Sequence, residues 1–365
     1  MCSVQRVVMP VTGAGSWTVL GDDGEVVAPA ERYLGYLSAL ERSPNTVRAY
    51  ALSLRLWFEF LGQAGVGWAD ADVEDVARFV AWLRAPAENV IVLETGAGRR
   101  SAATVNRHLA AVFGLYDHHA RSGVGVAAGL VAWRRVSRGS YKPFLHHVTK
   151  GKPVPTRPAR LIVTRRAPRT LDAGQVAAIL AACEHLRDRF LLALLAETGM
   201  RVGQALGLRH GDFVSRGREV HIVPRAGNAN GARAKLREAA VIPVPAPLVR
   251  LYSEYMHAEY GDIDSDYVFV NLFAGPVGQP LCYRTVHQLI GRIAARTGIA
   301  FTAHMLRHTH ATELIRSGVP VEVVARLLTH RSSTTTSQTC IHLDAADVRE
   351  ALTRAGVWAE TGSGR

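Results

Sequence analysis

The chain has 365 residues, 48% of them hydrophobic, and a formal net charge of +12 with a pI near 10.0. This length allows two buried cores, and the charge favours nucleic acid as a partner because basic side chains displace counterions from phosphates. The four cysteines form no CxxC pair and no apolar stretch is long enough to span a bilayer, which argues against a disulfide framework, a cysteine zinc site and a membrane protein.

The first third of the chain predicts a helical domain. Residues 1–27 mix glycine with β-branched residues, which is typical of an arm or a short hairpin. Further on, apolar residues recur at helical spacing in four stretches: 28–40, 46–61, 73–83 and 102–122. These stretches predict a bundle of four or five helices that ends near residue 125. Trp57, Phe58 and Phe60 fit the apolar stripe, so we expect them in the core rather than stacked on bases.

A second domain is predicted from residue 170 onwards. Two segments have helical patterns: 172–182 and 185–198. The second helix should end at a Gly199 turn that presents Arg201. Two short β-rich runs follow: 219–224 and 239–244. They flank a segment rich in Gly, Asn and Ala, so we expect a hairpin with Lys235 at its far edge.

Several basic side chains in this domain suit a phosphodiester. Arg201 ends a TGMR turn, and His304 and Arg307 lie three residues apart in an HMLRH segment, so they share a helical face for which Thr302 is a candidate N-cap. Guanidinium groups bind the non-bridging oxygens of a phosphate, which favours Arg201 and Arg307 for that role. Lys235 could protonate a departing alkoxide, and His304 could accept a proton from the attacking group.

Each of these residues also has an ordinary explanation. A loop lysine is usually a solvated charge, but Lys235 is the only lysine after Lys152, so no other lysine competes for the role of acid. His304, His308 and His310 lie close together, yet Met305 stands where a zinc-protease motif has glutamate, which argues against zinc. We therefore expect no metal and no cofactor.

These motifs resemble the tyrosine recombinase or phage integrase family over roughly residues 28–358. In that family the site consists of an arginine in a TGxR turn, a hairpin lysine, an HxxR helix start, a later histidine and a tyrosine nine or ten residues further on. The residues of this chain that match the cations of the site are Arg201, Lys235, His304, Arg307 and His330. Their order makes the signal specific, although each motif alone would be weak. The SPNTVRAY segment at 43–50 also resembles the start of the family's DNA-clamping domain.

The resemblance implies a mainly α protein in two domains. An N-terminal helical DNA-clamp domain, of the SAM-like core-binding type, would be followed by a mixed, mainly α catalytic domain with a small β-hairpin or sheet. The corresponding boundaries are an arm at 1–27, the clamp domain at 28–132, a basic linker at 133–169, the catalytic domain at 170–358 and a tail at 359–365.

The sequence departs from the family pattern at three positions. Gln204 stands where a glutamate usually follows the first arginine; it could still orient Arg201 by hydrogen bonding but supplies no charge. Thr329 stands where glycine is common. Cys340 occupies the position of the nucleophilic tyrosine, and no tyrosine follows Tyr283. Cys340 could mark an engineered or natural loss of the nucleophile, a working thiol nucleophile, or a buried cysteine after evolutionary decay. A cysteine side chain is much shorter than a tyrosine side chain, so we expect loss of strand cleavage.

Residues 133–170 contain eleven Lys or Arg and no Asp or Glu. Such a run is usually a solvated linker. Between two DNA-clamping domains, we expect it instead to follow the DNA backbone as a strap. The arginines that we expect to contact DNA are Arg165, Arg166 and Arg169 in the strap, and Arg233 and Arg237 beside Lys235. The last two could also be simple surface residues.

The resemblance implies a site-specific DNA recombinase or integrase of a mobile element. Strand cleavage and rejoining would proceed by metal-free transesterification in a synaptic tetramer, so the expected partners are duplex DNA and further copies of the chain. We expect residues 348–358 to form a helix that docks on a neighbouring copy, with packing against its own domain as the alternative. We find no targeting segment and expect a cytoplasmic, nucleoid-associated protein.

Two alternatives remain. Cys340 allows a catalytically inactive DNA-binding accessory protein. Residues 311–330 resemble a helix-turn-helix, so a transcription regulator is the other alternative. That regulator would explain the basic charge but not Arg201 and Lys235 a hundred residues upstream.

Overall fold

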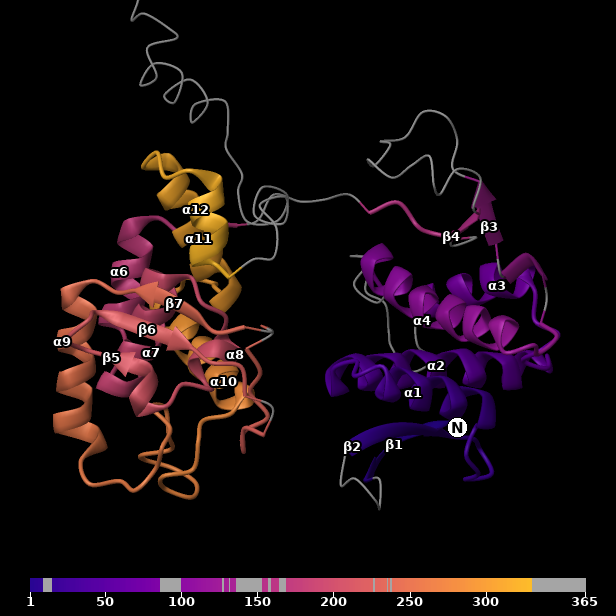
Figure 1. Cartoon of the computed structure of the whole chain (residues 1–365), viewed down its shortest axis with the longest axis horizontal. Coiled ribbons are helices and arrows are strands. Elements are labelled where there is room, and N and C mark those ends of the chain that lie inside the picture. The colour runs from indigo at the N-terminus through magenta and orange to yellow at the C-terminus, as the bar shows by residue number, and fades with distance from the viewer. Residues whose placement is uncertain are drawn as a thin grey trace, which may run out of the picture. The chain divides into compact units, whose positions relative to one another are not determined.

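The structure is a computed structural model. It describes residues 1–8, 15–85, 100–126, 128–130, 132–135, 153–156, 159–163, 169–225, 227–234, 236 and 238–329. The chain divides into two compact units, Met1–Arg165 and Arg166–Arg365 (Figure 1). No helix within the described ranges is long and apolar enough to cross a membrane.

The first unit is a helical bundle that begins with a β-hairpin. Strands β1 (Ser3–Val8) and β2 (Gly15–Leu20) pair antiparallel and pack on the first two helices. The α-helices of the described part are α1 (Ala28–Ala39), α2 (Pro44–Ala64), α3 (Val73–Arg84) and α4 (Ala102–Arg121). The predicted helical bundle is confirmed, and the predicted arm or hairpin at 1–27 contains a hairpin.

Local caps explain where these helices begin. Ser43 accepts a hydrogen bond from the Thr46 amide at the start of α2, and Asp72 forms a capping box with Asp75 at the start of α3. Inside the bundle, Trp57 is fully buried and donates from Nε1 to the Tyr116 hydroxyl at 3.2 Å. Because Trp57 and Phe60 are both buried, their predicted place in the core is confirmed.

Part of the basic segment belongs to the first unit. A 3₁₀ turn, η1 (Ala128–Leu130), precedes strands β3 (Ala132–Arg135) and β4 (Pro153–Thr156), which pair antiparallel. The Asn106 side chain of α4 donates to the Leu161 carbonyl at 2.9 Å and accepts from the Leu161 amide at 2.8 Å. These two hydrogen bonds hold the backbone at Leu161 against α4.

The second unit is mainly α-helical with one small sheet. Its α-helices are α6 (Ala173–Ala181), α7 (Leu186–Thr198), α8 (Val202–Ala205), α9 (Ala246–Tyr255), α10 (Tyr283–Thr297), α11 (Ala303–Arg316) and α12 (Val321–Leu327). A 3₁₀ turn, η2 (His210–Asp212), precedes the sheet, and a π-helical turn, η3 (Met256–Tyr260), continues α9. The sheet has the order β5 (Phe213–Val214), β6 (Glu219–Ile222), β7 (Ala240–Pro243), with antiparallel pairs. The predicted fold class and the predicted hairpin are thus confirmed.

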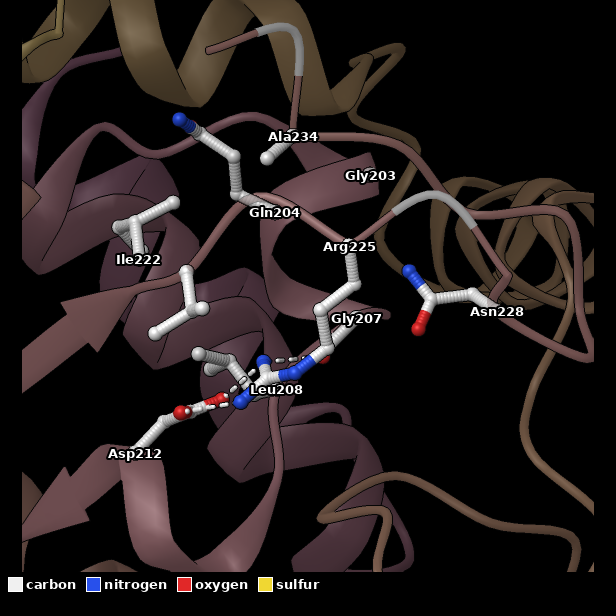
Figure 2. A pocket seen from close by; sticks show the side chains of 10 residues that line it. Gly203, Gln204, Gly207, Leu208, Asp212, Ile222, Arg225, Asn228 and Ala234 are labelled. Atoms are coloured by element: carbon white, nitrogen blue, oxygen red, sulfur yellow. Dashed lines mark hydrogen bonds and ion pairs between the residues drawn. The ribbon is translucent and has the colours of Figure 1, made fainter. Parts of the chain in front are cut away.

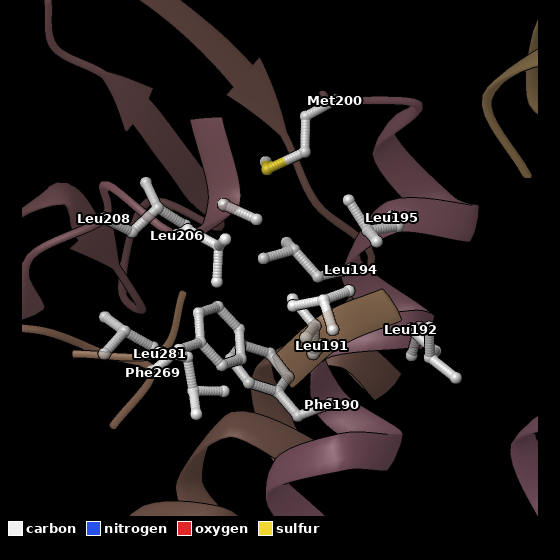
Figure 3. Packing of buried hydrophobic residues seen from close by; sticks show 14 of the residues in the cluster. Phe190, Leu191, Leu192, Leu194, Leu195, Met200, Leu206, Leu208, Phe269 and Leu281 are labelled. Carbon is white, nitrogen blue, oxygen red and sulfur yellow. The ribbon is translucent and has the colours of Figure 1, made fainter. Parts of the chain in front are cut away.

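Helix α7 forms the centre of the second unit because it is apolar on nearly every side. Phe190, Leu191 and Leu194 are fully buried in the main cluster, which Figure 3 shows together with Met200 and Phe269. A helix that is buried all round needs neighbours on several faces, and α7 packs against both α9 and α11. This packing fixes the end of α7, where the turn that carries Arg201 begins.

Candidate active site

A cavity of about 470 Å³ in the second unit collects basic side chains from distant parts of the sequence. Its titratable and charged lining residues are Arg201, Arg233, Tyr283, His287, His304 and Arg307. The described residues that line it include no aspartate or glutamate. A concave surface lined by several cations and by no described carboxylate favours an anionic ligand.

Arg201 is presented by a tight turn at the end of α7. Gly199 has a φ of 60°, and a side chain there would collide with Leu328 and His310, so the turn requires glycine. The Thr198 hydroxyl donates to the Leu194 carbonyl at 2.5 Å and accepts from the Met200 amide at 3.2 Å, which fixes the turn from within. The TGMR motif therefore has a local structural reason for each of its first two residues.

Arg307 lies at the buried end of the cavity, with only 1% of its surface exposed. Its Nη1 donates to the Gly199 carbonyl at 2.5 Å, and its Nη2 donates to the Leu328 carbonyl at 2.6 Å. The guanidinium thus ties the turn that carries Arg201 to the end of α12. The sequence pattern assigned Arg307 to the phosphate alone, and the structure adds this bracing role.

His304 lies in the first turn of α11 and also lines the cavity. Thr302 is the N-cap, as predicted, since its hydroxyl accepts from the Met305 amide at 3.2 Å. Burial lowers the pKa of His304 below its ordinary value, and the nearby charges of Arg307 and Arg201 lower it further. The imidazole is therefore neutral at neutral pH and able to accept a proton.

Two asparagines that were not predicted as functional residues organise the loop before Lys235. Asn230 donates from Nδ2 to the carbonyls of Leu206 at 2.9 Å and Leu281 at 2.7 Å, and accepts from the Ala232 amide at 3.0 Å. Asn228 donates to the Ala232 carbonyl at 2.8 Å. The signal was present in the Gly- and Asn-rich composition of the loop, because asparagine side chains commonly bond to nearby backbone.

Glycine at 203 allows this loop to approach the site. A side chain at Gly203 would lie 2.6 Å from the Arg233 carbonyl and would also collide with the Tyr283 hydroxyl. Arg233 consequently reaches the cavity that also contains Arg201. Tyr283 and His287, at the start of α10, were not predicted as site residues, and no sequence motif marked them.

Arg225 provides a contrast with the arginines of the cavity. It lines a separate small pocket with Gln204, Asn228 and Ala234 (Figure 2). Its Nη1 and Nη2 donate to the two carboxylate oxygens of Asp212 at 2.6 and 2.7 Å. The pair with Asp212 raises the pKa of Arg225. The charge of Arg225 is compensated by this carboxylate, so Arg225 stabilises the loop and is a poor candidate for a phosphate ligand.

The structure thus brings together four of the predicted site residues, Arg201, Arg233, His304 and Arg307. Arg169 is described and exposed, and it does not line the cavity. The other predicted residues lie outside the described residues: Arg165, Arg166, Lys235, Arg237, His330 and Cys340. The predicted helix at 348–358 lies outside them as well. No cluster of His, Cys, Asp and Glu that could hold a metal ion occurs in the part of the chain that the structure describes.

Comparison with known proteins assigns both units to one family. Residues 169–347 match the phage integrase family, and residues 30–123 match the N-terminal SAM-like domain of phage integrases. The chain belongs to the phage integrase family. The resemblance to tyrosine recombinases inferred from the sequence is therefore confirmed.

Two curated relatives illustrate the similarity. Transposase A from transposon Tn554 of Staphylococcus aureus is 38% identical over 348 residues, which cover 95% of this chain and 96% of the relative. Tyrosine recombinase XerD of Mycobacterium leprae is 29% identical over 316 residues, which cover 83% of this chain and 89% of the relative. These matches run through both units.

Solved structures agree on the fold. A Tn1549 transposon integrase in complex with a circular intermediate DNA has a TM-score of 0.62 at 13% identity, covering 89% of this chain and 99% of that one. XerH recombinase in a post-cleavage complex with difH substrate has a TM-score of 0.59 at 19% identity, covering 87% and 81%. The predicted function, a site-specific recombinase or integrase of a mobile element, is confirmed, and the alternative of an inactive accessory protein or a helix-turn-helix regulator is not favoured by these comparisons.

Proposed function

We propose that the cavity of the second unit binds the scissile phosphate of duplex DNA, where strands would be broken and rejoined if the nucleophilic tyrosine were present. We propose further that the chain as it stands, with Cys340, binds its DNA site without cutting it. The observation that carries the proposal is the convergence of Arg201, His304 and Arg307 in one cavity that no described carboxylate lines. Fixed cations of this kind stabilise the charge that builds on a phosphate during transesterification.

The proposed roles follow from the chemistry of each group. Arg201 and Arg307, with His330, hold the non-bridging oxygens of the scissile phosphate. A nucleophile attacks phosphorus while His304 accepts its proton, a new bond to phosphorus forms, and the bond to the 5′ oxygen breaks. Lys235 donates a proton to that departing oxygen. The reaction is a balanced exchange of one ester for another and requires no oxidant, reductant or cofactor.

Cys340 is the residue by which this chain differs from a recombinase able to cleave DNA. A thiolate attacks carbon and sulfur readily, but its product with DNA would be a phosphorothioester, which differs in reactivity from a phosphotyrosine. The sulfur is also one bond from Cβ, whereas a phenolic oxygen lies far from the backbone. An accessory protein that binds DNA without cleavage is thus the second candidate function, favoured by Cys340 alone.

Duplex DNA and further copies of the chain are the proposed partners. The solved XerH structure contains its difH substrate, and the Tn1549 integrase structure contains a circular intermediate DNA, which supports DNA as the partner here. We propose assembly as a tetramer on two DNA sites, and localisation in the cytoplasm with the nucleoid.

Covalent trapping tests the proposed function. A duplex selected by the chain from a random pool is nicked near the cleavage point, so that the cut end diffuses away and the adduct accumulates. With Cys340→Tyr, we expect an adduct that Arg201→Ala in the same protein abolishes. An adduct that survives Arg201→Ala would remove Arg201 from the proposed site.

The pH dependence of cleavage should reflect the protonation state of His304. Its pKa is lowered in the folded protein, so in the Cys340→Tyr protein we expect cleavage to be level near neutral pH and to fall as the pH drops from 6.5 through the lowered value. The same shift contributes stability that is present above 6.5 and lost as the pH falls through that window, since the unfolded chain binds the proton more readily. Cleavage rates measured between about pH 4.5 and 8.5, roughly two units each side of a typical histidine pKa, check the predicted acidic limb. If the His304→Gln protein keeps the same acidic limb, another group is responsible.

The strap should bind phosphates of the DNA backbone. Replacing Arg165, Arg166 and Arg169 with Ala should weaken binding to every duplex and flatten the log–log salt slope by about 0.9 for each phosphate that is no longer neutralised. Fluorescence anisotropy over a salt series measures the slope. The matched control replaces Arg216 and Arg250, two exposed arginines of the second unit, with Ala. An unchanged slope in the strap variant would place these arginines away from DNA.

A further inference from the structure

We infer that Thr329 and Gln204 form a hydrogen-bonded pair that positions Arg201 for the phosphate; this inference rests on the proposed function of Arg201. The Thr329 hydroxyl accepts from Arg201 Nη1 at 3.2 Å and from Gln204 Nε2 at 3.0 Å. Gln204 Oε1 in turn accepts from the Arg201 backbone amide at 2.7 Å. The two side chains therefore hold Arg201 at both its backbone and its guanidinium.

The orientation of the hydroxyl follows from the donors around it. The Arg201 amide can only donate, so the oxygen of the Gln204 side chain must face it, and the NH₂ group must face Thr329. The guanidinium of Arg201 can also only donate. Thr329 Oγ1 must therefore accept both bonds, and its own proton points away from Arg201. A side chain without an acceptor at 329 would break both hydrogen bonds at once.

Backbone strain indicates that Thr329 is retained for this hydroxyl. Thr329 has a φ of 55°, in the left-handed region that β-branched residues rarely adopt. It follows the end of α12, where its amide bonds the Arg326 carbonyl at 2.9 Å and where glycine would be the favoured residue. The other described non-glycine residues with positive φ, Glu41 and Arg218, are exposed. Strain at a half-buried residue next to a cavity is typical of a functional position.

Gln204 and Thr329, the two departures from the family pattern nearest to Arg201, thus form one hydrogen-bonded pair. With glutamine at 204, an amide faces position 329, and with threonine at 329 an acceptor is present to receive it. Thr329 and Gln204 act through Arg201 and are positioning residues. They connect α8 with the end of α12, two segments that are 125 residues apart in sequence.

Three variants at position 329 separate the hydroxyl from the strain. Thr329→Ser keeps the acceptor, Thr329→Ala removes it and retains the strain, and Thr329→Gly removes both. In the Cys340→Tyr protein we expect Thr329→Ala and Thr329→Gly to slow single-turnover cleavage of the selected duplex by up to about 10²-fold, because small displacements of a catalytic group have effects of that size. Thr329→Ser should retain most of the rate. Thr329→Gly should melt no lower than Thr329→Ala, since glycine adopts positive φ without strain.

A structural role alone predicts a different pattern. If Thr329 served only the fold, cleavage would follow the melting temperature, and Thr329→Gly would cleave at least as well as Thr329→Ala and as well as Thr329→Ser. Parent-like cleavage by Thr329→Ala would likewise overturn the inference. If Thr329→Ala fails to fold, Thr329→Gly, which also lacks the hydroxyl but carries no strain, takes its place in the comparison with Thr329→Ser.

A binding experiment tests the same inference without cleavage. In the chain with Cys340, single phosphates of the selected duplex are replaced by neutral methylphosphonates. The phosphate bound by Arg201 is the one whose replacement weakens binding of the parent chain but not of Arg201→Ala. Replacement of this phosphate should cost Thr329→Ala less affinity than it costs the parent or Thr329→Ser. An equal cost in Thr329→Ala would overturn the inference while leaving Arg201 as a phosphate ligand. If no phosphate distinguishes Arg201→Ala from the parent, the role of Arg201 and this inference both fail.

Discussion

Cys340→Tyr should convert a chain that leaves no covalent mark on DNA into one that forms a 3′-phosphotyrosyl adduct. Nucleophilic attack requires the reacting atom about 3 to 3.5 Å from phosphorus and in line with the leaving oxygen. A family site built for a phenolic oxygen leaves a cysteine sulfur several bonds short. The cavity with Arg201, His304 and Arg307 is formed in the described part of the chain, so we expect the phenol to be the group whose absence prevents cleavage.

The measurement is a denaturing gel with the nicked duplex and the full chain. We expect no retained band with Cys340 and a retained band with Cys340→Tyr, and the band should be absent with Cys340→Phe, which has the ring but not the hydroxyl. An adduct formed by the unaltered chain and absent in Cys340→Ala would make the protein a thiol recombinase. The absence of any adduct with Cys340→Tyr, despite tight binding, would favour the accessory protein.

Arg307→Ala should destabilise the second unit by about 3 to 6 kcal/mol, because hydrogen bonds from a charged donor contribute roughly 1.5 to 3 kcal/mol each and two are removed. The side chain is 1% exposed, and its removal leaves the buried carbonyls of Gly199 and Leu328 without these donors. Arg201→Ala should change stability much less, because Arg201 is only half-buried. The two arginines should therefore differ in their effect on unfolding, although the same phosphate-binding role is proposed for both.

Thermal and urea unfolding of the full chain, followed by a signal from the second unit, measures this difference. Arg307→Lys is the matched control, because it keeps the charge but lacks the planar fork that reaches both carbonyls. We expect it to be intermediate between the parent and Arg307→Ala. If Arg307→Ala unfolds like the parent, the two hydrogen bonds to the carbonyls contribute little, and the role of Arg307 is confined to the phosphate.

The sequence alone was sufficient for the fold class and for the order of the motifs. Apolar spacing indicated the helices of the first unit because a 3.6-residue period directly encodes which face is buried. The TGMR and HMLRH segments could be assigned to one site because they are short, ordered and chemically distinctive. Thr302 was recognisable as an N-cap because capping depends on residues only three positions apart.

Contacts between distant segments were decided only by the tertiary structure. Three such contacts join residues that lie far apart along the chain. Arg307 donates hydrogen bonds to the carbonyls of Gly199 and Leu328. The backbone of Arg233 lies close to Gly203, and Gln204 donates a hydrogen bond to Thr329. Sequence patterns report periodicity and local bonding, but they do not report which carbonyl a long side chain reaches once the helices pack. For that reason Gln204 and Thr329 looked like two independent departures in the sequence, and only the fold, which brings Thr329, just beyond α12, within hydrogen-bond distance of Gln204, made them partners.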